Sequence, residues 1–157
     1  MIRQLFTLLA LLIGMHLGAV RSEADTLFVS NRTDITQFDM SGAPTIFTAT
    51  PILNNPLGLA FDTAGNLYVA NELSNAVRRF SPTGVDLGDF ASTGLFQPFG
   101  LAFDTTGNLY VSNFAFVGGS VRRFSPTGLD LGIFASAGLD RPEHIAFDAA
   151  GNLYVSN

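Results

Sequence analysis

The chain contains short runs in which large hydrophobic residues alternate with small ones. Between Gly58 and Phe61, the small Gly58 and Ala60 alternate with Leu59 and Phe61, so an extended segment here has one flat face and one protruding face. Gly-containing and Pro-containing turns separate this run from three further apolar runs. The pattern indicates no helix and predicts four short strands, at residues 58–61, 67–70, 77–80 and 85–90.

This group of strands recurs along the chain. The stretch 58–71 returns almost unchanged as 100–113 and as 144–157, so that Asn71, Asn113 and Asn157 follow one another at intervals of 42 and 44 residues. A shorter copy ends at Asn31, 40 residues before Asn71. A period of about 40 to 45 residues built from four strands is typical of a propeller blade. The sequence therefore predicts an all-β fold, a β-propeller of four-stranded antiparallel blades.

The repeat boundaries predict about three blades. They comprise a partial blade at 25–50, full blades at 56–92 and 98–136, and a partial blade at 142–157. Closed propellers need about four blades or more, so this array is expected to be part of a propeller. A truncated or partial reading frame is the expected explanation, and the alternatives are two short arrays that self-associate through their open blade edges and a gene remnant without function. The total blade number stays open.

The N-terminal segment has the pattern of a secretory signal peptide. Arg3 is followed by an uncharged apolar run from Leu5 to Val20, and the small Ser22 and Ala24 match the two cleavage positions. We expect a signal peptide at 1–24 and a secreted or periplasmic protein. An uncleaved membrane anchor is the alternative, although 16 apolar residues fall short of the roughly 20 that span a bilayer. No stable membrane span is expected after cleavage.

Composition excludes several functions. The chain has no Cys, which excludes disulfides and thiolate chemistry. Its formal net charge is −5 and all eight basic residues are Arg. A surface of this sign repels phosphate backbones, so nucleic acid is not an expected partner.

The repeats resemble a known family. The string Pro-Phe-Gly-Leu-Ala-Phe-Asp-Thr-Thr-Gly-Asn-Leu-Tyr-Val-Ser-Asn at 98–113, followed by Val-Arg-Arg-Phe-Ser-Pro-Thr-Gly at 121–128, resembles the NHL repeat. It is more loosely similar to six-bladed propellers that include gluconolactonase-like hydrolases and streptogramin lyases. The resemblance implies that the first strand of each blade lies innermost and the fourth outermost. It implies no single activity, because folds of this kind host many functions.

Two sets of polar residues recur at fixed positions in the repeats. Asp62, Asp104 and Asp148 each begin a Gly-containing turn, where a carboxylate accepts bonds from the turn backbone. An Asn ends each second strand, and its amide is expected either to bond the neighbouring loops or, as at Asn113, to contact a metal or ligand at the channel mouth.

The third copy departs from the others just after its proline. Glu143-His144 replaces Leu57-Gly58 and Phe99-Gly100. A carboxylate and an imidazole can move a proton or bind a metal, which makes Glu143 and His144 candidate catalytic residues, with ordinary repeat drift as the alternative. Resemblance to the gluconolactonase-like enzymes implies a metal ligand near Glu143, with Ca²⁺ or Mg²⁺ as the cofactor if the protein is enzymatic.

Two further features of the sequence suggest a binding role. Phe114 and Phe116 lie in the loop 114–120, whose length and sequence differ from those of its counterpart at 72–76, and variable loops on a constant scaffold commonly carry specificity. Together with Phe99 they are expected to line an apolar pocket, with core packing as the alternative. Adjacent arginines at 78–79 and 122–123 are expected to pack between blades and bond loop carbonyls, or to hold an anion.

These observations lead to two hypotheses. The first is an exported NHL-type propeller segment that acts as a non-catalytic binding scaffold for a protein or a small molecule. The second is a metal-dependent lactonase or lyase of the six-bladed group that uses Glu143 and His144.

Overall fold

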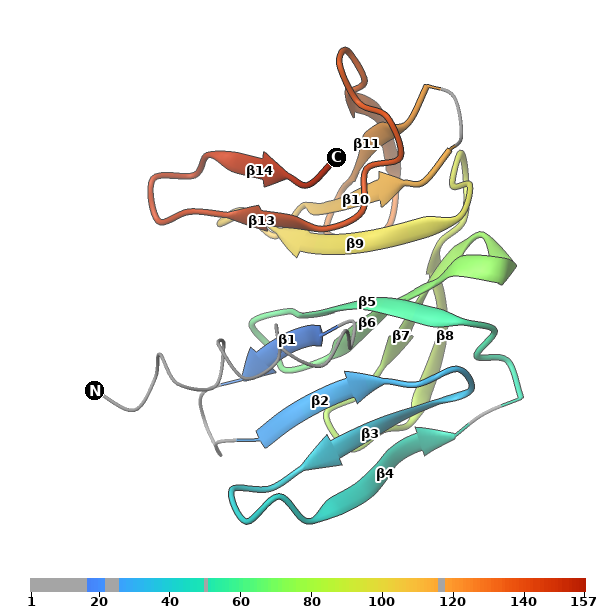
Figure 1. The fold of residues 1–157 in the computed structure, drawn as a ribbon, viewed down its shortest axis with the longest axis vertical. Coiled ribbons are helices and arrows are strands. Elements are labelled where there is room, and N and C mark those ends of the chain that lie inside the picture. Colours follow the sequence, from blue (N-terminus) through green and yellow to red (C-terminus); the bar gives the residue numbers. More distant parts are fainter. Residues whose placement is uncertain (1–16, 22–25, 50, 116–117) are drawn as a thin grey trace.

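A computed structural model describes residues 17–21, 26–49, 51–115 and 118–157, which form fourteen strands and one short 3₁₀ helix (Figure 1). The first sheet contains β1 (Leu17–Arg21), β2 (Thr26–Ser30), β3 (Asp34–Phe38) and β4 (Pro44–Ala49). The second contains β5 (Pro56–Phe61), β6 (Leu67–Asn71), β7 (Ala76–Phe80) and β8 (Asp86–Ala91), with η1 (Glu72–Ser74) between β6 and β7. The third contains β9 (Pro98–Phe103), β10 (Leu109–Asn113), β11 (Ser120–Phe124) and β12 (Asp130–Ala135), and β13 (Ile145–Phe147) and β14 (Leu153–Val155) form a final two-stranded sheet.

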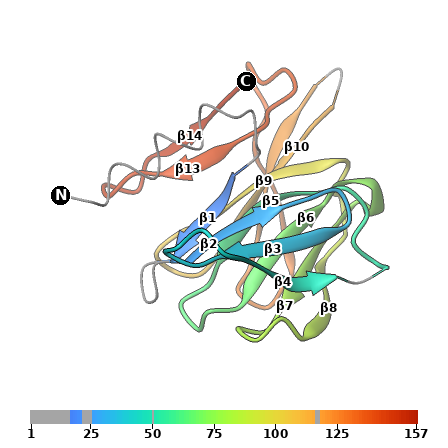
Figure 2. The same cartoon turned by 60° about the horizontal axis from the view of Figure 1, so that its bottom comes forward.

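Each sheet is an antiparallel meander in which strands pair in chain order. The first strands β1, β5, β9 and β13 lie next to one another, and the later strands of each sheet extend away from them (Figures 1 and 2). The predicted all-β architecture of four-stranded antiparallel sheets is therefore confirmed.

The first sheet differs from the expectation in its number of strands. The sequence predicted a partial blade at 25–50, whereas β1, from inside the segment assigned to the signal peptide, completes a four-stranded sheet with β2, β3 and β4. Residues 1–16 and 22–25, which hold most of that segment, lie outside the described residues. Within the described part of the chain, no helix is long and apolar enough to cross a membrane.

The sheets stack through the two faces that the alternating pattern predicted. Leu59 packs in the core between the first and second sheets, whereas Ala60 packs in the core between the second and third. A Cβ atom at Gly58 would lie 2.2 Å from the backbone oxygen of Phe99, and one at Gly100 would lie 2.4 Å from that of Glu143. Glycine at these positions lets neighbouring first strands come into backbone contact, because any side chain would overlap a carbonyl group.

An aromatic cluster joins each pair of neighbouring sheets. Tyr68 makes edge-to-face contacts with Phe90 of its own sheet and Phe103 of the next, with both ring centroids 4.9 Å away. The same arrangement occurs around two other rings, in the sets Phe28, Phe47 and Phe61, and Tyr110, Phe134 and Phe147. Edge-to-face pairs contribute about 0.5–1.5 kcal/mol each beyond the area they bury, so these clusters help to hold the sheets together.

The turns between the first and second strands of the sheets use their Asp as expected. One carboxylate oxygen of Asp104 accepts the backbone N–H of Asn108 at 2.9 Å, and the other accepts its side-chain amide at 2.9 Å. The hydroxyl of Tyr110 lies 3.3 Å from the same carboxylate. Burial raises the pKa of Asp104, but hydrogen bonds from Asn108 and Thr106 outweigh it and lower this pKa to about 2.

The outer hairpins carry an ion pair that the sequence analysis did not foresee. Arg78 binds Asp86 through two parallel hydrogen bonds of 2.8 and 2.7 Å, and Arg122 binds Asp130 in the same way at 3.0 and 2.5 Å. These arginines thus cross-link the third and fourth strands of one sheet, and we find no bond from them to loop carbonyls among the described contacts.

The Asp104 turn makes the stability of the protein pH-dependent. Its folded-state pKa is depressed from 3.8 to about 2, so its contribution is complete above about pH 4 and is lost as the pH falls towards 2. In urea unfolding, the stability advantage of the wild type over Asp104→Asn should shrink by about 1 kcal/mol over this range, after allowance for solvent screening. The exposed Asp140→Asn serves as the control, and an advantage that does not change with pH would contradict this role of Asp104.

Candidate functional site

The candidate site lies where the second strands end and the first strands begin. The first strands β5, β9 and β13 are each preceded or opened by a proline, which we call the returning proline (Pro56, Pro98 and Pro142), and each second strand is followed or ended by an Asn, which we call the terminal Asn (Asn31, Asn71, Asn113 and Asn157). Pro56 pairs with Asn71 and Pro98 pairs with Asn113. The residues beside these prolines and asparagines therefore meet at the same end of the stacked sheets. We call this end the mouth. It carries two cavities, and the residues that line them come from all four sheets.

The terminal asparagines fasten the loops that enter the mouth. The Asn113 side chain accepts the backbone N–H of Phe96 at 3.2 Å and donates to the carbonyl of Gly94 at 3.0 Å. Asn71 and Asn157 bond residues at the same sequence separations, 17 and 19 positions earlier. Asn31 differs, because its amide donates to the side chains of Asp34 and Thr36.

The residue before each returning proline adopts a left-handed backbone conformation. The φ angles of Asn55, Gln97 and Arg141 are 54°, 45° and 55°. Non-glycine residues in such conformations cost of order 1–3 kcal/mol and are commonly found at functional sites. Here they turn the chain at the mouth, and a different side chain stands at this position in each sheet.

The larger cavity has a volume of about 550 Å³. Its walls combine the rings of Phe99 and Phe114 with the charged side chains of Arg32, Glu72 and Glu143. Glu72 is held by the side-chain amide of Asn55, which donates to its carboxylate at 2.6 Å.

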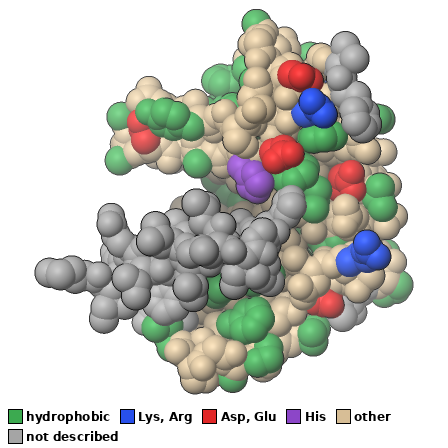
Figure 3. All heavy atoms as spheres, in the orientation of Figure 1, with side chains coloured by type: hydrophobic (Ala, Val, Ile, Leu, Met, Phe, Trp, Pro, Cys, Tyr) green, Lys and Arg blue, Asp and Glu red, His purple; other side chains and the backbone are tan. Residues whose placement is uncertain are grey.

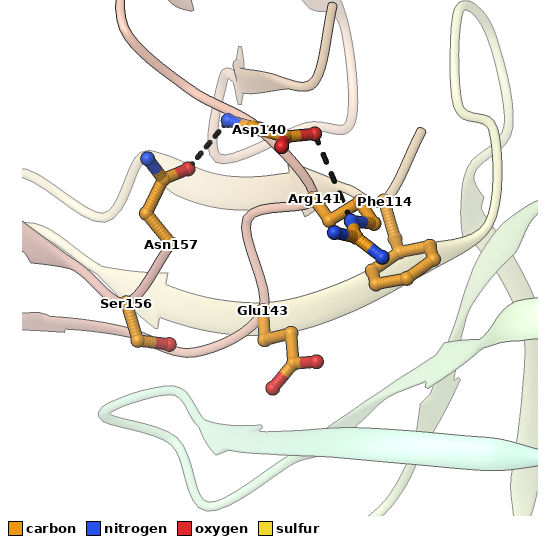
Figure 4. A pocket seen from close by; sticks show the side chains of 6 residues that line it. All are labelled: Phe114, Asp140, Arg141, Glu143, Ser156 and Asn157. Atoms are coloured by element: carbon orange, nitrogen blue, oxygen red, sulfur yellow. Dashed lines mark hydrogen bonds and ion pairs between the residues drawn. The ribbon is translucent and has the colours of Figure 1, made fainter. Parts of the chain in front are cut away.

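The smaller cavity has a volume of about 440 Å³ and shares Phe114 and Glu143 with the larger one (Figure 4). The other residues of its lining are Asp140, Arg141, Ser156 and Asn157. Arg141 lies 3.7 Å from the carboxylate of Asp140, and both side chains are more than half exposed. Glu143 is thus the charged residue common to both cavities.

The aromatic side chains of the mouth lie close together. The ring centroids of Phe99 and Phe114 are 6.0 Å apart, and the imidazole of His144 meets the Phe99 ring edge-on at 5.4 Å. The predicted Phe114 therefore lines the mouth, whereas Phe116 lies outside the described residues.

Glu143 and His144 stand side by side at the mouth. The Glu143 carboxylate is 4.0 Å from Nδ1 of His144, and both side chains are about half exposed, at 48% and 53%. Figure 3 shows the histidine, in purple, beside acidic and hydrophobic side chains on this face. The Glu143 backbone is fixed, since the Ser112 hydroxyl donates to its carbonyl and its N–H donates to the carbonyl of Ser156. An exposed carboxylate held in this way can bind a cation or a hydrogen-bond donor.

The described residues contain no group of three or more His, Cys, Asp or Glu side chains that could hold a metal ion. Asn113, the other predicted ligand, already uses its amide to bond Phe96 and Gly94. Metal binding by Glu143 and Asn113 stays a prediction from the resemblance.

Several mouth residues were missed at the level of sequence. Arg32, Glu72 and Arg141 line the cavities, yet none was singled out. The available signal was positional. Arg32 and Glu72 each follow a terminal Asn, and Arg141 precedes a returning proline. The residue type at these positions changes from repeat to repeat, whereas the neighbouring Asn or Pro is constant.

Solved structures with a similar fold include binding proteins and enzymes. A structure of the nidogen/laminin complex matches with a TM-score of 0.78 and 20% identity, over 87% of this chain and 53% of that chain. A streptogramin B lyase matches with a TM-score of 0.72 and 15% identity, over 90% of this chain and 47% of that chain. A gluconolactonase-like protein matches with a TM-score of 0.70 and 19% identity, over 86% of this chain and 52% of that chain. No protein-family model and no curated protein sequence matches this chain.

These likenesses define the fold class. The matched proteins are β-propellers, and this chain has the fold of part of one. It spans about half the length of the structures that it matches.

The asparagine bonds at the mouth predict unequal effects for two equivalent substitutions. Asn113→Ala should lower the free energy of unfolding by about 2 kcal/mol, because Asn113 is buried and its two hydrogen bonds, to Phe96 and Gly94, are partly shielded from water. Asn157→Ala removes the same two bonds from an exposed loop, where water replaces them, and should cost less than about 1 kcal/mol. Urea unfolding measures both values, and equal losses would show that burial does not govern these bonds.

Proposed function

We propose that this chain is part of an exported NHL-repeat propeller that acts as a binding scaffold, with the mouth as its ligand site. One observation carries the proposal: among the second, third and last sheets, side chains that differ between repeats gather at one end, whereas most of the other positions are the same. Leu57, Phe99 and Glu143 occupy one such position, and Phe99 and Glu143 share the larger cavity with Leu57.

The scaffold positions contrast with the mouth. The Asp-to-Asn turn bonds recur in three sheets, and so do the bonds from each terminal Asn. A rigid framework that presents different side chains at one end is the usual arrangement of a recognition surface. The nidogen/laminin neighbour belongs to a protein–protein complex, which supports a binding role for this fold.

The lining of the mouth indicates the chemistry of its ligand. Phe99 and Phe114 provide an apolar wall, and Glu143 provides a negative charge between the two cavities. We infer that the ligand, a peptide segment or a small organic molecule, combines an apolar or aromatic group with a cation or a hydrogen-bond donor.

Two simple probes of opposite charge test this inference. In ¹⁵N NMR titrations, 2-phenylethylammonium should shift the amide signals of residues near Phe99, Phe114 and Glu143, and it should bind at least about fivefold more tightly than phenylacetate, because Glu143 attracts a cation. Glu143→Gln should reduce this preference to less than about twofold, whereas Phe114→Ala should weaken the binding of both probes. Equal binding of the two probes by the wild type, or shifts confined to another surface, would refute a cation-selective mouth.

The second candidate function is a metal-dependent lactonase or lyase. The observation in its favour is that His144 lies 4.0 Å from Glu143, which lines both cavities, together with the fold likeness to a streptogramin B lyase and a gluconolactonase-like protein. No chemical step is assigned to this pair.

A melting experiment separates the two functions. If Glu143 holds a catalytic Ca²⁺ or Mg²⁺ ion, saturating metal should raise the melting temperature of the wild type by several degrees, because a ligand that binds only the folded state stabilises it. The rise should vanish in Glu143→Gln. An unchanged melting temperature in millimolar metal favours the binding scaffold.

Export is the remaining part of the proposal. The signal-like segment 1–24 supports a secreted or periplasmic location. N-terminal sequencing of the protein recovered outside the cytoplasm should begin at Asp25, and an intact Met1 there would contradict cleavage.

A further inference from the structure

The larger cavity of the mouth carries charges of both signs. Arg32, in the loop between β2 and β3, supplies a cation to its wall, and Glu72 and Glu143 supply two carboxylates. Among the described residues, no ion pair joins Arg32 to either of these carboxylates. Opposite charges that line one cavity without binding one another can each bind a complementary group of a ligand.

Asn55 fixes the cation and one of the carboxylates close together. Its backbone N–H donates to the carbonyl of Arg32 at 3.2 Å, and its side-chain amide donates to the carboxylate of Glu72 at 2.6 Å. The backbone N–H of Glu72 in turn donates to the carbonyl of Asn55 at 3.3 Å. These bonds join the first sheet to the second, and both sheets have four strands. The contacts between these two sheets therefore set the backbone positions of Arg32 and Glu72.

The neutral side-chain donors of the same wall already have protein partners. The Ser30 hydroxyl donates to the carbonyl of Leu57 at 2.8 Å. The Asn31 amide donates to Asp34 at 2.6 Å and to Thr36 at 2.8 Å. Recognition of a ligand in this cavity therefore depends on the charged groups and on the aromatic rings.

The charge balance of the cavity selects among small molecules. A ligand with a cation alone leaves the guanidinium of Arg32 without a counter-charge, and a polyanion such as phosphate is repelled by the two carboxylates. A zwitterion satisfies both signs. The volume of about 550 Å³ lies within the range of small-molecule sites, about 300–1,000 Å³. The rings of Phe99 and Phe114 add an apolar wall.

We propose that the larger cavity binds a zwitterionic small molecule, an α-amino acid with an apolar or aromatic side chain, and that Arg32 determines this specificity by binding the carboxylate of the ligand. Guanidinium and carboxylate groups match in two parallel charge-assisted hydrogen bonds. The ammonium group of the ligand faces Glu143 and Glu72, and its side chain lies against the rings of Phe99 and Phe114. This inference rests on the proposed ligand site at the mouth and narrows its ligand to a zwitterion.

Three probes that differ by one charged group test the inference. L-Phenylalanine carries both charges, 2-phenylethylammonium lacks only its carboxylate, and 3-phenylpropionate lacks only its ammonium group. In ¹⁵N NMR titrations of the intact chain at neutral pH, L-phenylalanine should shift the amide signals of residues near Arg32, Phe99 and Glu143. It should bind at least about fivefold more tightly than either of the other probes, because it alone meets both charges of the wall.

Two arginine substitutions show whether Arg32 is responsible. Arg32→Gln should reduce the advantage of L-phenylalanine over 2-phenylethylammonium to less than about twofold. The same variant should bind 2-phenylethylammonium at least as tightly as the wild type does, since a repulsive charge is removed, and this binding reports that the variant is folded. Arg141→Gln is the matched control, because Arg141 lines the smaller cavity rather than the larger one and the third sheet has Gln97 at the equivalent position. It should keep the full advantage.

The adverse results have distinct meanings. If 2-phenylethylammonium shifts the mouth signals of the wild type and L-phenylalanine binds no more tightly, specificity for a zwitterion is refuted and the cation-selective mouth stands. An equal loss of the advantage in Arg32→Gln and Arg141→Gln would overturn the assignment of Arg32. If none of the three probes shifts the mouth signals up to millimolar concentration, the proposed ligand site fails and this inference fails with it.

Discussion

The arrangement of the sheets depends on backbone contact between consecutive first strands. At Gly58 and Gly100 the next first strand comes so close that any side chain would overlap its carbonyl oxygen. Because of this close approach, the face of one sheet that carries large side chains packs against the face of the preceding sheet that carries small ones. The aromatic clusters around Tyr68 and Tyr110 then connect the outer strands across the same interfaces. Close packing of complementary faces, rather than any covalent link, holds the array.

The geometry of the mouth follows from this stacking. Once the first strands are fixed side by side, the residues around each returning proline must meet at one end of the array. The terminal asparagines fix the approaching loops, and the left-handed residues Asn55, Gln97 and Arg141 turn the chain there. Side chains such as Phe99, Phe114 and Glu143 can therefore vary without disturbing the scaffold, because they project from positions that other residues hold in place.

The last sheet differs from the second and third sheets on its face. His144 stands where those sheets have Gly58 and Gly100, and a Cβ atom at this position excludes the close backbone approach seen at the two glycines. The series of interfaces thus changes at His144.

Most of the strands, the turns and the packing faces can be predicted from the amino-acid sequence. These features are local: the period of two sets the faces of Leu59 and Ala60, and Asp104 bonds residues within four positions of itself. Three features emerge only in the folded chain: Arg32, Glu72 and Arg141 share the mouth with Glu143, Arg78 binds Asp86 rather than a loop, and β1 joins the first sheet. Those outcomes depend on how far each sheet is shifted and turned against the next. Contacts between residues distant in sequence fix that placement, and no single repeat specifies it.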